Sequence, residues 1–430
     1  LKKQYLKDDS IVDDFTKYYE KHCADSIDSC IDIVLLQLQK DDVEFTLIAH
    51  ELENILNENC NDYQALKCYQ ILLRLPSKYR NFIREEEIYF QMSDIAIRIA
   101  SWKDSQTYLK KILKVKHKES DLEGELYQII ACKNLGNMYG VTLELEQSLA
   151  ICKEGIKRTA THIEKNEFSD ATLQAEFERQ YEMLLNRIAV SYWFAGQPET
   201  SAPYQERALL LAQKRKDIYA IAHTLYESGM RQLHQDVHLG IENIKRALEI
   251  LPGKDKFTER QEKYLVETEL LIGQLLLYAE NNDMNLLVSI QHESEKLCQQ
   301  LLEENANYES TLCNIVNGIC NIMLGEYEKA MNRFFTALNS SNLGEFNTLR
   351  WKIYLNIAET FLLLYEQTKD SFLQEQAVRY AKCGRKILYA AMETNKNLDS
   401  YQKITETPYC YFNSIIDNTE FPIEKPEKPV

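Results

Sequence analysis

The sequence predicts an all-α fold that is built from stacked pairs of antiparallel helices. Only 13 glycines and 8 prolines occur among its 430 residues, so the residues that interrupt helices and form tight turns are scarce. Apolar residues recur three and four positions apart over long stretches, which is the spacing of one helix face. The segment from Ile241 to Leu251 is an example, with Ile244 and Ala247 between its ends. We find no segment with the alternating pattern of a half-buried strand.

One stretch of the sequence shows how a single helix pair is built. Its small and aromatic positions are Gly318 in an expected first helix, Gly325 in the turn, and Ala330, Phe334 and Ala337 on one face of an expected second helix. Small residues let the two helices pack closely, and the phenylalanine fills the space toward the next pair. Such a pair cannot bury its apolar face alone, so it requires neighbouring pairs of the same kind.

This unit resembles the tetratricopeptide repeat, a helix pair of about 34 residues. The second-helix signature of that family, Ala-x-x-x-Phe-x-x-Ala, is complete at residues 330–337, whereas Asn321 stands where the first helix of the family carries a tyrosine. The small first-helix position recurs at intervals longer than the family norm, at Ser93, Gly136, Ala189, Ser228, Gly273, Gly318 and Ala358. The resemblance implies a right-handed α-α superhelix, a solenoid of about seven to eight helix pairs.

The predicted organisation has three parts. Residues 85–395 are expected to form the repeats, and residues 1–84 an N-terminal helical segment of degenerate repeats or a cap. Residues 396–430 are expected to form a C-terminal cap and an extended tail, because Pro422, Pro426 and Pro429 lie among charged residues. The chain starts at Leu1 rather than at a methionine, which suggests a piece of a longer polypeptide.

Composition and charge disfavour several classes of partner. The net charge of −16 disfavours direct binding to nucleic acid or to an anionic membrane. The 11 cysteines form no Cys-x-x-Cys motif, which is typical of a reducing compartment, so we expect a cytoplasmic protein. No apolar run approaches the ~18 residues of a membrane span, and no signal peptide is visible.

Catalytic signatures are absent from the sequence, so we predict a protein that is not an enzyme. There is no glycine-rich phosphate loop, no Gly-x-Ser-x-Gly elbow and no set of kinase motifs. His50 and Glu51 begin like a zinc-protease motif, but Asn54 stands where the second histidine is required. His234 and His238 have a spacing that a metal can use, but we find no third ligand for them. We therefore predict neither a metal nor a cofactor.

The predicted binding surface is the concave side of the stack. In the family that the unit resembles, the first helix of each pair lines this side and carries many of the ligand contacts. Projecting that register gives the predicted ligand-binding residues Lys133, Asn134, Asn137, Asn186, Arg187, Trp193 and Tyr226. An asparagine can both donate to and accept from a peptide backbone, and a cationic side chain can pair with a carboxylate. The alternative is that these residues are only solvent-exposed polar surface of the groove and bind no ligand.

A later first helix, around Gly318, is expected to be strongly apolar. Its apolar residues are Leu312, Ile315, Ile319 and Ile322. Either the next turn of an open superhelix covers this face, or the face is exposed and binds a protein.

The leading prediction for function is a non-catalytic repeat module that binds a protein or peptide ligand. The chain looks like the repeat-built sensing end of a large signalling NTPase, including those of antiviral defence. One alternative is a cytoplasmic peptide-pheromone receptor that regulates transcription, because such receptors also use asparagine-rich concave grooves. Another alternative is a scaffold for multiprotein assembly. An upstream phosphate-binding loop would support the sensor, whereas a helix-turn-helix would support the receptor.

Overall fold

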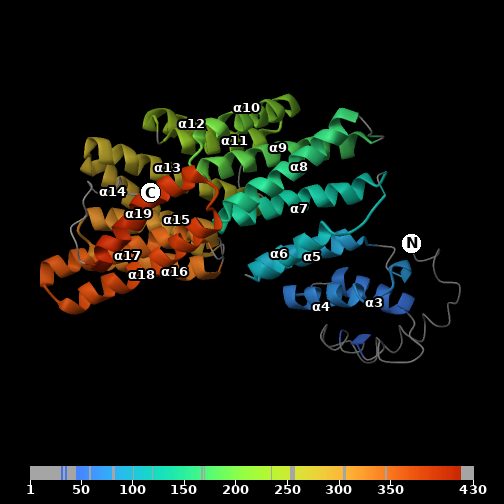
Figure 1. Cartoon of the computed structure of the whole chain (residues 1–430), viewed down its shortest axis with the longest axis horizontal. Coiled ribbons are helices and arrows are strands. Elements are labelled where there is room, and N and C mark those ends of the chain that lie inside the picture. Colours follow the sequence, from blue (N-terminus) through green and yellow to red (C-terminus); the bar gives the residue numbers. More distant parts are fainter. Residues whose placement is uncertain are drawn as a thin grey trace. The chain divides into compact units, whose positions relative to one another are not determined.

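The fold is seen in a computed structural model of the chain (Figure 1). The structure describes residues 31, 34–35, 45–57, 60–79, 83–99, 101–118, 120–165, 168, 170–233, 235–251, 257–303, 307–343 and 346–417. The predicted tail at 418–430 lies outside these residues. The chain divides into two compact units, unit 1 at Leu1–Ala131 and unit 2 at Cys132–Val430.

Unit 1 is helical throughout its described part. Its helices are α3 (Phe45–Asn57), α4 (Asp62–Leu72), the short 3-10 helix η1 (Ser77–Tyr79), α5 (Glu85–Arg98), α6 (Trp102–Ile112) and the first half of α7 (Leu122–Val141). Asn61 begins α4 with a capping box, because its side chain accepts from the Gln64 amide at 3.0 Å and the Gln64 side chain accepts from the Asn61 amide at 3.0 Å. Leu52, Leu72 and Ile88 are fully buried in the core that α3, α4 and α5 share.

The described part of unit 2 consists of the second half of α7 and twelve further helices. These are α8 (Leu145–Lys165), α9 (Ala171–Phe194), α10 (Pro198–Arg215), α11 (Ile218–Gln232), α12 (Val237–Ile250), α13 (Phe257–Asn281), α14 (Met284–Glu303), α15 (Asn307–Met323), α16 (Tyr327–Leu343), α17 (Asn347–Thr368), α18 (Ser371–Thr394) and α19 (Asp399–Asp417). Consecutive helices pack as pairs, and the first helices α9, α11, α13, α15 and α17 also contact one another in series. These first helices form the inner layer of unit 2.

The predicted all-α solenoid is confirmed. Among the described residues, helix pairs run from α3/α4 to α17/α18, which makes eight pairs, and α19 follows as a single helix. No strand occurs among the residues that the structure describes.

Local sequence explains where helices begin and end. Helices α9, α11, α12 and α18 each begin after an aspartate whose carboxylate accepts from a backbone N–H of the first turn, at Asp170, Asp217, Asp236 and Asp370. Gly325, which the sequence places in a turn, has a φ of 78° between α15 and α16. Glycine adopts this left-handed conformation without the steric penalty of a Cβ atom.

In two consecutive repeats, a serine of the second helix donates a hydrogen bond to the backbone carbonyl of the small residue in the first helix. Ser148 on α8 donates to the carbonyl of Gly136 at 2.7 Å, and Ser201 on α10 donates to the carbonyl of Ala189 at 2.7 Å. A second-helix hydroxyl can reach a first-helix carbonyl only where the two backbones lie close together. The small residues at these positions therefore set the spacing within each pair.

Unit 2 closes on itself, whereas the sequence suggests an open spiral. Asn395, fully buried between α18 and α19, donates to the carbonyl of Leu143 at 2.6 Å and accepts from the amide of Glu146 at 3.1 Å. Ser400 donates to the carbonyl of Ala195 at 2.5 Å. These bonds join segments 252 and 205 positions apart, so the α18–α19 turn meets the turns after α7 and α9 (Figure 1). We call these contacts the seam.

The seam also has an apolar core. Its buried members come from both sides, and they are Leu143, Leu145, Ala195, Ala391 and Tyr401. An interface with buried apolar side chains and satisfied buried polar groups is stable. Closure is therefore a property of the fold of unit 2, and Asn395 is one of several side chains whose hydrogen bonds hold it.

The packing of adjacent repeats explains the apolar helix around Gly318. Every residue of α15 from Ser310 to Ile322 is buried, including Leu312 and Ile319. Helices α13, α14, α16 and α17 contact α15, so neighbouring repeats cover it on several sides. The face is therefore buried and is not an exposed binding surface, but the adjacent repeats cover it rather than a further turn of the superhelix.

Candidate functional site

The inner layer of unit 2 lines a groove of about 840 Å³, which we call the concave groove. Its lining residues come from α7, α9, α11, α13 and the first turn of α15. This volume falls within the range of about 300–1,000 Å³ that is typical of ligand pockets. The groove is thus the place where the first helices of consecutive repeats meet around a shared space.

Six of the seven predicted ligand-binding residues line the concave groove. The lining residues among them are Lys133, Asn134, Asn137, Asn186, Arg187 and Tyr226. Trp193 is not part of the lining, because it lies at the C-terminal end of α9, where its ring packs on Phe194 with the ring centres 5.1 Å apart. The register of the first helices therefore brings six predicted residues together, and their contact with a ligand stays a prediction.

Arg187 reaches the concave groove next to a glycine. A Cβ atom at Gly136 would lie 3.5 Å from Cγ of Arg187 and would collide with the thiol of Cys152. The Arg187 guanidinium forms no hydrogen bond or ion pair with another described residue. Burial raises the pKa of Cys152 to about 12, so this neighbouring thiol is not a nucleophile at neutral pH.

Asn186 is held rigidly at the wall of the groove. Its Nδ2 donates to Oε1 of Glu182 at 2.9 Å and to Oγ1 of Thr224 at 3.1 Å. Glu182 is 1% exposed and pairs with Arg215 at 2.6 Å. Burial raises the pKa of Glu182, and Arg215 opposes that shift. With its nitrogen fixed in this way, Asn186 has a buried Oδ1 that no described group satisfies.

His223, on the neighbouring helix α11, lies between two carboxylates. Its Nε2 lies 3.3 Å from Glu227, and its Nδ1 lies 2.9 Å from Glu262. Burial alone would lower the pKa of His223, but the two carboxylates outweigh it and raise that pKa to about 10. The imidazole is therefore charged at neutral pH, and its ring meets Tyr226 edge-on with the centres 5.0 Å apart.

The sequence prediction missed the acidic part of the concave groove. Glu182, His223, Glu262 and Glu309 also line it. Glu182 and His223 lie one helical turn from predicted residues on α9 and α11, so extending the register by a turn would have found them. Glu262 and Glu309 lie in helices where no repeat signature marks the concave face.

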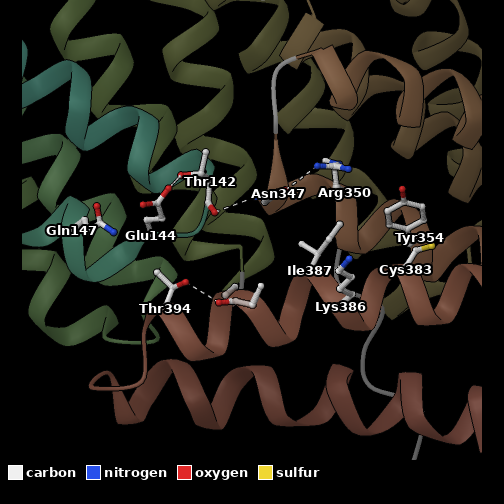
Figure 2. Close-up of a pocket in the computed structure, with 12 residues that line it drawn as sticks. Thr142, Glu144, Gln147, Asn347, Arg350, Tyr354, Cys383, Lys386, Ile387 and Thr394 are labelled. Carbon is white, nitrogen blue, oxygen red and sulfur yellow. Dashed lines mark hydrogen bonds between the residues drawn. The ribbon is translucent and has the colours of Figure 1, made fainter. Parts of the chain in front are cut away.

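A second cavity of about 560 Å³ lies beside the seam, between α17, α18 and the start of α8 (Figure 2). Several of its polar groups pair with one another, although Nε of Arg350 is buried without a hydrogen-bond partner among the described residues. Thr142 donates to Glu144 at 2.9 Å, Asn347 donates to the carbonyl of Thr142 at 3.4 Å, and Arg350 donates to Asn347 at 3.2 Å (Figure 2). These bonds hold the closed unit together, so the concave groove is the better candidate for a ligand site.

The described residues limit the chemistry of the site. No group of three or more His, Cys, Asp or Glu side chains among them could hold a metal ion. His234 lies outside the described residues, so its pairing with His238 is not tested. Within the described part of the chain, every helix is too short or too polar to cross a membrane. The groove offers hydrogen bonds and charges rather than a nucleophile.

Comparison with known proteins bears on the fold. No family model and no curated protein matches the chain. The solved Rap conjugation gene regulator of the plasmid pLS20, in complex with the Phr* peptide, is similar over 88% of this chain and 96% of its own, with 13% identity and a TM-score of 0.52. This likeness agrees with a tetratricopeptide-repeat-like solenoid.

Two further solved structures are similar at lower scores. A Rap protein complexed with Competence and Sporulation Factor matches 91% of this chain and 96% of its own, with 12% identity and a TM-score of 0.48. A Signal Transduction ATPase with Numerous Domains from Pyrococcus horikoshii, which has a tetratricopeptide repeat sensor, matches 93% of this chain and 62% of its own, with 13% identity and a TM-score of 0.35.

Proposed function

We propose that unit 2 is a non-catalytic module that binds a short peptide in the concave groove. The observation that carries this proposal is the unmet hydrogen-bonding and charge capacity on the groove wall. Asn137 is exposed there, Oδ1 of Asn186 is buried without a partner, and Arg187 has no ion pair with a described residue. A peptide backbone supplies the N–H and C=O groups that such amides bind, whatever its side chains.

The size and rigidity of the concave groove favour a short ligand. A space of about 840 Å³ excludes a folded domain but accepts a short extended segment. The seam holds the walls in place before the ligand arrives, so less ordering opposes binding. A lining rich in amides and charges suits a peptide better than it suits an apolar small molecule.

In this proposal the module is a sensor whose peptide ligand changes the activity of a partner or of a linked domain. The Rap conjugation gene regulator, which shares the fold, was solved with a peptide bound, and this favours a peptide-responsive regulator. The sensor of a larger signalling or defence protein is the other setting for the same module. A phosphate-binding loop or a helix-turn-helix in a flanking segment would distinguish the two settings.

Retention of a pool of random hexapeptides by the immobilised chain tests the proposal, with retained peptides counted by mass spectrometry. The chain should enrich a subset of the pool. The double variant Asn137→Ala/Arg187→Ala should retain these peptides at least about tenfold less. The matched control is Asn332→Ala/Arg246→Ala, which removes the same residue types from exposed positions on α16 and α12. Equal retention by the chain and the groove variant, with unchanged helical circular dichroism, would contradict the proposal.

A further inference from the structure

Two opposite charges in the concave groove form no ion pair within the described part of the protein, although Arg187 lies close enough to the carboxylate of Glu227 to lower its pKa. Arg187 extends from α9 and Glu309 from the first turn of α15, and neither forms an ion pair with another described residue. They also do not pair with each other. Both nevertheless act on the ionisation of Tyr308, which places the two charges in the same electrostatic neighbourhood.

The other buried charges of the groove are compensated within the protein. Glu182 pairs with Arg215, and His223 lies between Glu227 and Glu262. The unmatched pair is therefore a specific feature and not a general property of a charged lining.

The surroundings of Glu309 make its isolation unfavourable. Its side chain is half-buried, and burial raises its pKa even though its own backbone amide donates to it. A charged group that is removed from water without a partner is destabilising, whereas a charge-assisted hydrogen bond to it is strong. A ligand that brings a cation to Glu309 and an anion to Arg187 would satisfy both groups at once.

We propose that the ligand of the concave groove carries two opposite charges, a carboxylate that pairs with Arg187 and an ammonium or guanidinium that pairs with Glu309. This inference rests on the proposed function. Because the first helices follow in the order α9, α11, α13 and α15, the two charges also fix the direction of the bound chain. The anionic end lies at α9 and the cationic end at α15. The two termini of a peptide or its acidic and basic side chains can supply these charges.

Hexapeptide pools with defined ends test the inference on the full chain. Four pools contain only uncharged residues and differ in their termini. The first pool has both termini free, the second has an acetylated amine, the third has an amidated carboxyl, and the fourth has both termini blocked. A fifth pool has both ends blocked but contains aspartate, glutamate, lysine and arginine. If the termini supply the charges, the free pool should be retained about tenfold or more above each singly blocked pool. If side chains supply them, the fifth pool should exceed the fully blocked uncharged pool by the same factor.

Two variants assign each charge to its partner. In Glu309→Gln, acetylating the amine should no longer lower retention, because the carboxylate that would pair with the amine is already gone. In Arg187→Gln, amidating the carboxyl should no longer lower retention, because the guanidinium that would pair with the carboxylate is already gone. Each variant should leave the other effect intact. Asn332→Gln on the outer helix α16 is the control and should change neither.

The outcomes separate this inference from the proposed function. If all five pools are retained equally and Asn137→Ala reduces that retention, the groove binds peptides but the two-charge inference is wrong. The two-charge inference is also wrong if acetylating the amine and amidating the carboxyl lower retention by Glu309→Gln and Arg187→Gln as much as they lower retention by the unaltered protein. If no pool is retained, or if retention ignores every groove variant, the proposed function fails and the inference fails with it.

Discussion

A Cβ atom at Gly318 would lie 2.5 Å from Cε1 of Phe334, a ring that is fully buried between α15 and α16. The ring therefore occupies the volume that any side chain at position 318 would need. The same relationship recurs at the end of the chain, where a Cβ atom at Gly384 would collide with the ring of Phe412. A glycine on one helix and a phenylalanine on another thus form a repeated packing device.

The first prediction follows from this device. Gly318→Ala should lower the free energy of unfolding by about 1–3 kcal/mol, because the added methyl group forces a buried aromatic ring out of its position. Urea unfolding followed by circular dichroism measures the loss. The double variant Gly318→Ala/Phe334→Leu should be less unstable than the sum of its single variants, because the smaller side chain relieves the overlap.

Gly140→Ala is the control for this prediction. Gly140 is also a buried helical glycine, but the nearest atom to an added Cβ is Oγ of Ser148 at 3.9 Å. Alanine should be neutral or stabilise the protein by up to about 1 kcal/mol there, because it favours the helix. A loss at Gly140 equal to that at Gly318 would show that the ring contact is not the cause.

The repeat fold could be predicted because its signals are local. Gly318 and Phe334 lie on consecutive helices with the turn glycine Gly325 between them, so the spacing alone reveals the pair. The seam could not be predicted in this way. Asn395 meets Leu143 across 252 positions, and a single asparagine after a helix has many other ordinary explanations.

The candidate site was predictable to the extent that it follows helix register. Asn137 and Arg187 were placed correctly on the groove wall because the inner face of a first helix repeats with the helical period. The charge network around His223 depends on Glu262, which a different helix brings to it. No spacing in the sequence encodes a pairing between side chains of two repeats.

The second prediction concerns the seam. Asn395→Ala should lower the free energy of unfolding by about 2–3 kcal/mol, because it leaves the buried carbonyl of Leu143 and the amide of Glu146 without their partner. Hydrogen exchange should also become faster at residues 143–146, since the seam then opens more often. Asn332→Ala, at an exposed position on α16, should change neither quantity. Unchanged exchange at residues 143–146 would show that Asn395 does not hold the closure.

The third prediction concerns the buried ion pair behind Asn186. Arg215→Met should cost about 3–5 kcal/mol at neutral pH, because it leaves the carboxylate of Glu182 buried without its ion-pair partner. Adding Glu182→Gln should recover most of this loss, since glutamine is neutral and still offers Asn186 an oxygen. Urea titrations of the single and double variants make the comparison. A loss below about 1 kcal/mol for Arg215→Met would mean that water reaches Glu182 in solution.

The fourth prediction concerns pH. The folded protein holds the pKa of His223 at about 10, above the ordinary value of about 6.5 that applies to the unfolded chain. A raised histidine pKa stabilises the folded state fully below about pH 6.5, and this contribution disappears as the pH rises toward 10. The stability advantage of the protein over His223→Gln should therefore be largest at pH 6 and should shrink steadily toward pH 10.

Two measurements check this pH dependence. Urea unfolding at several pH values gives the difference between the protein and His223→Gln, and NMR of the imidazole protons gives the titration midpoint directly. His238→Gln is the control, because His238 is exposed and the structure shows no ion pair for it among the described residues. It should shift stability by a similar small amount at every pH. An imidazole midpoint near the ordinary value would mean that Glu227 and Glu262 do not enclose His223 in solution, because both carboxylates favour its charged form.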